Sequence, residues 1–324
     1  MYFPYVRGRQ YELLALRELA TNNLLGDSVT PIVEPVKLSP TLVNVMAEFI
    51  KIGHPISIIR NPAVGTFMSD WQDVQEQSKE AAYKQRFSEQ YKDSTIIKSL
   101  IMQENAKVLL ELWDEQNVNK SDLLVINTDR DYLELYESTF ETEVPRYVLM
   151  PDESVFRRKV RHHKVLLDDK FERQGRNADY QESEDEFFSD DHLFYKEDGF
   201  IGFSDYSVVG NEYLEAGFAP YAVAIHIVYF TSDKTLRVRH FVSDSNEDIT
   251  NPALKFYEAV SKLAAWYNAG PHPVEMTSGL RTFLQHHEQQ SYPGLGTVKK
   301  LSLMHHLELM GKFLARGNAY VLLQ

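Results

Sequence analysis

The fold of this chain is indicated by one short stretch, Thr30-Pro31-Ile32-Val33-Glu34-Pro35-Val36-Lys37. It is apolar, too short for a helix, and interrupted by a single carboxylate. Short apolar runs that end in a charged or polar residue recur along the chain, for example at residues 56–60 and 164–168. Such runs are typical of buried parallel strands, whose carboxyl ends gather at one face of a sheet. The pattern predicts an α/β protein with charged side chains around one rim.

Strand and helix patterns alternate through the first two-thirds of the sequence. Helical spacing at residues 10–25 and 41–51 separates the first three strands. Eight strands linked by helices predict a TIM-barrel-like (β/α)8 barrel, with an open doubly wound sheet as the alternative. The predicted strands are residues 3–7, 31–36, 56–60, 108–112, 123–128, 146–150, 164–168 and 200–204.

Four segments do not fit a minimal barrel. Residues 63–98 are polar and are expected to form an inserted helical excursion, and the acidic residues 172–198 are expected to form a solvated loop. Residues 221–244 have the pattern of a β-hairpin, which could instead supply the last barrel strand. Helical patterns separated by breaks at residues 270–273 and 293–296 fill the C-terminal part. The expected domains are a barrel at 1–245 and a helical region at 246–324 that packs on it.

Composition narrows the function classes. The 324 residues include no cysteine, which excludes disulfides, a thiol nucleophile and thiolate metal ligands. A net charge of −13 argues against non-specific nucleic-acid binding. No apolar run approaches the roughly 20 residues of a membrane span, and the first residues do not resemble a signal peptide. We therefore expect a cytoplasmic protein, and no motif indicates an organic cofactor.

Glu34 is the most unusual acid, because it lies inside an apolar strand and a buried carboxylate needs a cationic partner. Glu111 also has apolar neighbours, and Asp205 follows a predicted strand. We expect Glu34, Glu111 and Asp205 to act as catalytic acid and base. Together with Asp168 they are expected to hold Mg²⁺ or Mn²⁺, which prefer carboxylate oxygen.

Cationic residues at the same rim predict an anion site. Arg7 and Arg60 follow the first and third predicted strands, Lys37 follows the second, and a guanidinium suits phosphate. The alternative is that Arg7 or Arg60 simply neutralises Glu34. His305-His306 follows a glycine-marked, lysine-bearing turn into a helix and is a further candidate for anion binding, although adjacent helical residues do not share a face.

The opening Tyr2-Phe3-Pro4-Tyr5-Val6-Arg7-Gly8-Arg9-Gln10-Tyr11-Glu12, the strand at residues 30–35 and the closing His305-His306-Leu307 resemble the phage and bacterial "beta protein" family. The resemblance implies a barrel-like α/β protein of phages, mobile elements and bacterial gene pairs, without an established reaction. Arg7, Glu12, Glu34 and the histidine pair match the positions that define this family.

Two hypotheses follow. The first is a cytoplasmic protein of a phage-conflict (anti-phage defence) or mobile-element gene pair, whose barrel mouth binds a phosphate-containing ligand and acts as a metal-dependent phosphodiester hydrolase. The second is a non-catalytic scaffold that works with a protein partner encoded by the adjacent gene. A homo-oligomer is compatible with either hypothesis.

Overall fold

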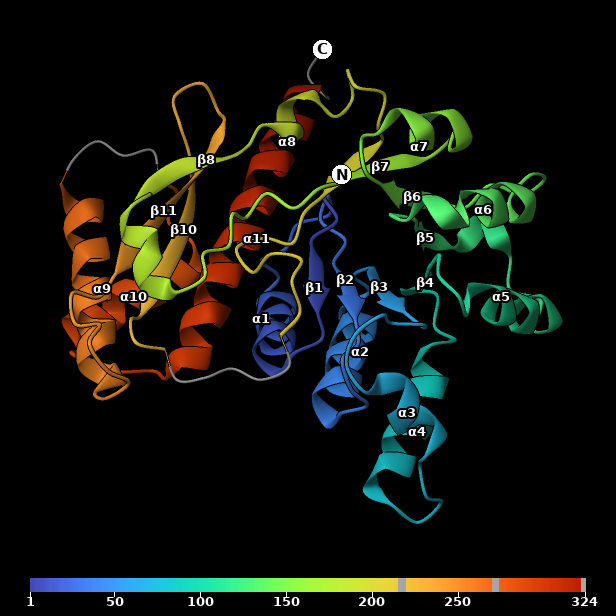
Figure 1. The fold of residues 1–324 in the computed structure, drawn as a ribbon, viewed down its shortest axis with the longest axis horizontal. Coiled ribbons are helices and arrows are strands. Elements are labelled where there is room, and N and C mark those ends of the chain that lie inside the picture. Colours follow the sequence, from blue (N-terminus) through green and yellow to red (C-terminus); the bar gives the residue numbers. More distant parts are fainter. Residues whose placement is uncertain (215–219, 270–273, 322–324) are drawn as a thin grey trace. The chain divides into compact units, whose positions relative to one another are not determined.

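The computed structural model describes residues 1–214, 220–269 and 274–321, and it divides into two compact units (Figure 1). Unit 1 comprises Met1–Thr21, Asp27–Asp168 and Phe194–Asp205. Unit 2 comprises Asn22–Gly26, Asp169–Leu193 and the chain from Tyr206 onward. This division differs from the expected boundary at residue 245, because the hairpin belongs with the C-terminal helices. The expected helix break at residues 270–273 lies outside the described residues.

Unit 1 is a nearly closed parallel barrel, which confirms the predicted fold class. Its eight strands follow one another in chain order around the sheet. The ring returns to its start through a parallel bridge between Tyr2 and Phe203 and a 2.9 Å hydrogen bond from the Tyr5 backbone N–H to the Asp205 carbonyl. The strands are β1 (Tyr5–Arg7), β2 (Ile32–Glu34), β3 (Ile56–Ile59), β4 (Ile96–Ile101), β5 (Leu124–Ile126), β6 (Tyr147–Met150), β7 (Lys164–Leu167) and β9 (Gly202–Ser204).

The barrel interior is filled by side chains from alternate strand positions. The rings of Phe3 and Tyr147 contact each other with their centroids 4.8 Å apart, although these residues are far apart in the sequence. The hydroxyls of Ser57 and Ser99, on neighbouring strands, are hydrogen-bonded to each other. The intervening strand positions face the surrounding helices. This is the period-two pattern expected for a closed parallel sheet.

Helices cover the outside of the barrel, as Figure 1 shows for the two that flank β1 and β2. The second of them begins where Ser39 accepts a hydrogen bond from the Leu42 N–H, with Pro40 in the first turn, and it ends at Gly53 in the left-handed conformation. The helices of unit 1 are α1 (Gln10–Thr21), α2 (Pro40–Ile52), α3 (Phe67–Gln72), α4 (Lys79–Gln90), α5 (Ala106–Glu115), α6 (Leu133–Thr139) and α7 (Ser154–Lys159), with 3-10 turns η1 (Lys120–Asp122) and η2 (Arg130–Tyr132).

One predicted strand is wrong. Residues 108–112 belong to α5, whose buried face carries Leu109, Leu110 and Trp113 at helical spacing. The fourth barrel strand is β4, which the sequence reading missed because Lys98 and Ser99 interrupt its apolar run. Lys98 lies half-buried over the Tyr91 ring.

The excursion at residues 63–98 contains two helices, α3 and α4, as expected, but its last residues, 96–98, belong to β4. Its core is aromatic, with Phe67 and Phe87 fully buried against Trp71. Arg86 donates a 3.0 Å hydrogen bond to Asn44, which links α4 to α2. The excursion starts at the carboxyl end of β3, the end of the barrel where the charged strand termini lie.

Unit 2 contains a separate antiparallel sheet of three strands in the order β10, β11, β8. The predicted hairpin is confirmed, but it does not complete the barrel. The acidic segment is not only a loop: β8 pairs with β11, and Asp185 forms ion pairs with Arg237 and Arg239. The elements are η3 (Asn177–Gln181), β8 (Asp185–Ser189), α8 (Asp191–Phe194, at the border of the units), β10 (Ala224–Phe230), β11 (Leu236–Val242), α9 (Pro252–Asn268), α10 (Ser278–Glu288) and α11 (Leu295–Val321). In the described part of the chain, no helix has the length and apolar character needed to cross a membrane.

Candidate functional site

A closed network of polar groups surrounds Glu34 at the mouth of the barrel. Glu34 ends β2, opposite Arg7 at the end of β1, and it is completely buried. Its Oε2 forms an ion pair with Arg7 and accepts a 2.6 Å hydrogen bond from the Tyr5 hydroxyl. Its Oε1 accepts a 2.7 Å hydrogen bond from the Ala63 backbone N–H. Both carboxylate oxygens are therefore engaged within the chain.

This network decides between the two interpretations of Glu34. The cation that compensates the buried carboxylate is Arg7, whose side chain is only 12% exposed. A metal ion at Glu34 would have to displace Arg7, and a buried cation that loses its partner is strongly destabilising. The donor set thus fits a structural ion pair and does not fit a divalent cation.

Arg60 follows β3 directly and has a different environment. Its guanidinium carbon lies 4.1 Å from the centre of the Trp71 ring, and Nη1 lies 3.8 Å from the sulfur of Met68. Among the described residues no carboxylate forms an ion pair with it, so Arg60 does not neutralise Glu34. Burial lowers the pKa of Arg60 below its usual value, because the charged form is partly removed from water.

The backbone beside Arg60 is held by a network of side-chain amides that the sequence reading did not single out. The Asn61 Nδ2 donates to the Ile101 carbonyl and to Asn105 Oδ1, each at 2.8 Å, and its Oδ1 accepts from the Ile101 N–H at 2.9 Å. Gln103 donates to the Asn61 carbonyl at 2.6 Å. These bonds tie the end of β3 to the end of β4. The Asn61-Pro62 pair directly after an apolar strand was the available signal.

Asn127 is a second polar group at the carboxyl end of a strand that sequence reasoning missed. It follows β5 and is fully buried. Neither its amide nitrogen nor its amide oxygen has a hydrogen-bond partner within the described chain. Buried amides are nearly always satisfied, so such a group indicates a place for water or a ligand.

The predicted carboxylate group is not assembled. Glu111 is exposed on α5, so the expectation that it lies at the end of a barrel strand is wrong. Asp168 is exposed after β7, and Asp205 is buried after β9, where it accepts a 2.8 Å hydrogen bond from the Tyr2 hydroxyl. Throughout the described ranges, no three His, Asp or Glu side chains are placed to hold a metal ion.

The remaining predicted ligand-binding residues are not members of the Glu34 network. Lys37 is exposed beyond β2. His305 and His306 belong to unit 2 and are completely buried in α11. His305 has both ring nitrogens engaged, at 2.7 Å from Thr277 Oγ1 and 2.7 Å from the Val228 carbonyl, and the Nδ1 of His306 lies 2.8 Å from the Ser207 hydroxyl. These imidazoles are packed in a core and present no exposed surface to a ligand.

No protein-family model, curated protein or solved structure matches this chain. The resemblance to the beta protein family therefore remains a prediction.

Proposed function

We propose that the mouth of the barrel in unit 1 binds a small ligand that carries a phosphate group, with Arg60 as its anchor. The observation that carries this proposal is the half-buried guanidinium of Arg60, which lies at the carboxyl end of a barrel strand without a carboxylate partner among the described residues. Sites in this fold are built at that end of the barrel. A guanidinium suits the oxygens of phosphate, and the Trp71 ring restricts where it points.

The geometry supports the expectation that the barrel mouth binds a phosphate-containing ligand. It does not support the expectation of metal-dependent hydrolysis. Glu34 is held by Arg7 and Tyr5, and Glu111 lies on an outer helix, so neither is placed to activate water. Arg7 is already neutralised and contributes rigidity to the rim. The proposed function is accordingly ligand binding or sensing by a protein of a phage-conflict or mobile-element gene pair, the context that the family resemblance implies.

The test is a titration of the whole chain with inorganic phosphate and with methyl phosphate, followed by calorimetry or NMR. Arg60→Met removes the charge but keeps a side chain that packs on Trp71, and we expect it to weaken binding about tenfold or more, as loss of a charge-assisted hydrogen bond does. Arg60→Lys should retain part of the affinity. Arg158→Met, at an exposed arginine of α7, is the matched control. Equal phosphate affinity in Arg60→Met and the unaltered chain would refute the proposal.

The second candidate function is a non-catalytic scaffold. It is favoured by the completeness of the Glu34 network, which needs nothing from outside the chain. If the unaltered chain binds neither phosphate probe, and forms a stoichiometric complex with the purified product of the adjacent gene in sedimentation, the scaffold function is supported. A protein that sediments alone and binds phosphate through Arg60 contradicts it.

A further inference from the structure

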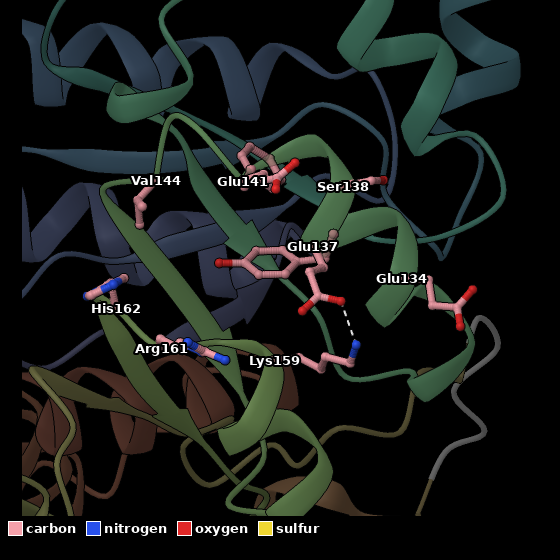
Figure 2. A pocket seen from close by; sticks show the side chains of 10 residues that line it. Glu134, Glu137, Ser138, Glu141, Val144, Lys159, Arg161 and His162 are labelled. Atoms are coloured by element: carbon pink, nitrogen blue, oxygen red, sulfur yellow. Dashed lines mark hydrogen bonds and ion pairs between the residues drawn. The ribbon is translucent and has the colours of Figure 1, made fainter.

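A cavity of about 580 Å³ lies in unit 1 at the opposite end of the barrel from the mouth (Figure 2). It is formed by α6, by the segment that leads into β6, and by the segment between α7 and β7. Its volume is within the range of sites for small ligands. The lining residues are Glu134, Tyr136, Glu137, Ser138, Phe140, Glu141, Val144, Lys159, Arg161 and His162.

The walls of this cavity carry opposite charges. The basic side chains of Lys159, Arg161 and His162 line one side in Figure 2, and Glu141 lies across from Arg161 and His162. The acidic wall comes from α6 and the residues after it, and the basic wall comes from the end of α7 and the residues before β7. Figure 2 thus shows that the cavity lies between two separate segments of unit 1 and has polar walls.

Among the described residues, only one ion pair joins the two walls. Lys159 and Glu137 form an ion pair at 2.5 Å. Arg161 and Glu141 form no ion pair within the described chain, so their charged atoms are further apart than 4.0 Å. A cation and an anion that face one cavity without meeting leave room for a ligand that carries both charges.

The floor between the walls is aromatic, buried and uncharged. The rings of Tyr136 and Phe140 contact each other with centroids 5.2 Å apart. Burial raises the pKa of Tyr136 to about 12, so its hydroxyl stays neutral at physiological pH. The Nδ1 of His163 lies 2.7 Å from the Pro145 carbonyl, which ties the segment before β7 to the segment before β6. This bond and the Lys159–Glu137 ion pair connect the two walls.

We propose that this cavity binds a short zwitterionic peptide, whose carboxylate contacts Arg161 and whose ammonium contacts Glu141. The volume has room for a tripeptide, whose charged ends are roughly 10 Å apart when it is extended. The planar guanidinium of Arg161 can donate two hydrogen bonds to the peptide carboxylate, and the carboxylate of Glu141 can accept hydrogen bonds from the peptide ammonium. This peptide site is independent of the phosphate site proposed at the mouth.

The experiment is an NMR or calorimetric titration of the whole chain with three probes: triglycine, N-acetyl-triglycine and triglycine amide. The first has both charges, the second lacks the ammonium and the third lacks the carboxylate. We expect triglycine to bind with a Kd of about 1 mM, as suits two partly exposed charge contacts, and each capped peptide to bind about fivefold or more weakly.

Substitutions locate the binding. Arg161→Gln and Glu141→Gln should each weaken triglycine binding about fivefold to tenfold, by loss of one charge contact. Arg158→Gln and Glu115→Gln are the charge-matched controls, because both side chains are exposed and neither lines the cavity. The proposal is overturned if triglycine does not bind at 20 mM ligand, if either capped peptide binds as well as triglycine, or if either cavity variant binds like its control.

Discussion

Unit 1 and unit 2 both bury charged side chains in ion pairs, but unit 2 also buries a set of histidines whose pKa values are lowered. In unit 1 the completely buried Glu34 is an anion compensated by Arg7. Unit 2 also buries charged groups, Lys255 and Glu308, each in an ion pair. In addition it buries imidazoles, and burial lowers the pKa of His305 to about 4 and of His306 to about 3. A charged pair is sensitive to loss of a partner, whereas a neutral imidazole is sensitive to acid. The two units should therefore fail under different challenges.

A second histidine cluster strengthens this contrast. His226 and His240 lie opposite each other on β10 and β11, and their Nδ1 atoms are 2.7 Å apart. The Nε2 of His240 is 3.1 Å from a carboxylate oxygen of Glu186. Burial, followed by the neighbouring His240, lowers the pKa of His226 well below its usual value, and burial lowers that of His240 to about 4. Two rings that share one hydrogen bond cannot both carry a second proton.

The largest expected effect is acid destabilisation of unit 2. Each buried imidazole has a folded-state pKa below its unfolded value of 6.5, so the unfolded chain binds more protons in acid. This stability is complete above pH 6.5 and is lost as the pH falls towards the folded-state pKa. For His305 alone the loss is roughly 3 kcal/mol by pH 4, and the other buried histidines of unit 2 add to it.

The measurement uses tryptophan fluorescence during urea unfolding at pH 7.5, 5.5 and 4.5. Of the three tryptophans, Trp266 belongs to unit 2, while Trp71 and Trp113 belong to unit 1. A Trp266→Phe variant therefore reports unit 1, and a Trp71→Phe/Trp113→Phe variant reports unit 2. The midpoint of unit 2 should fall more steeply with pH. An unchanged midpoint of unit 2 between pH 7.5 and 4.5 would show that these imidazoles are not buried in neutral form.

The next effect concerns the charged pair of unit 1. Glu34→Gln leaves the Arg7 cation buried without its counter-charge, and we expect it to lower the free energy of unfolding by about 3–5 kcal/mol. Glu111→Gln removes an exposed carboxylate from α5 and should change stability by less than about 0.5 kcal/mol. Chemical denaturation of both variants at pH 7 measures the two free energies of unfolding. Similar stabilities would mean that the Glu34 network contributes little to the barrel.

The smallest effect compares two helix caps. Ser39 caps α2 in unit 1 and Thr277 caps α10 in unit 2, and each accepts a 3.2 Å hydrogen bond from the N–H three residues on. Thr277 additionally donates to the Nδ1 of His305, because the Nε2–H of that ring is directed to the Val228 carbonyl. Ser39→Ala should cost about 1 kcal/mol.

Thr277→Ala should cost about 2 kcal/mol, since it removes a cap and leaves a buried imidazole nitrogen unsatisfied. Thr277→Ser, which keeps the hydroxyl, should recover most of the loss. Urea unfolding at pH 7 gives both values. Equal costs for Ser39→Ala and Thr277→Ala would indicate that His305 does not depend on this hydroxyl.

Much of the barrel could be predicted from the sequence, because buried parallel strands are short apolar runs bounded by helical patterns. Residues 108–112 were misassigned because a run of five residues with four apolar side chains fits a strand or a helix. The helical spacing becomes visible only when Leu109, Leu110 and Trp113 are taken together. β4 was missed because polar residues interrupt its apolar run. Its Ser99 is polar but satisfied inside the barrel by Ser57, a compensation that a linear pattern does not reveal.

The candidate site was predictable only in part. Glu34 was correctly singled out as a carboxylate that needs a cation, and Arg7 was one of the partners considered. The sequence could not place Glu111 on an outer helix or His305 in the core of unit 2, because both depend on contacts between distant segments. Asn127 carries no motif, and its lack of a partner is visible only in three dimensions.

Closure of the barrel joins residues that leave the ribosome far apart in time. Tyr2 and Tyr5 must wait for Phe203 and Asp205 before the ring can be completed. At about 5–20 residues per second, that delay is roughly 10–40 s of synthesis. Throughout this interval β1 has an unpaired edge, and an unpaired strand edge is a template for pairing with another chain.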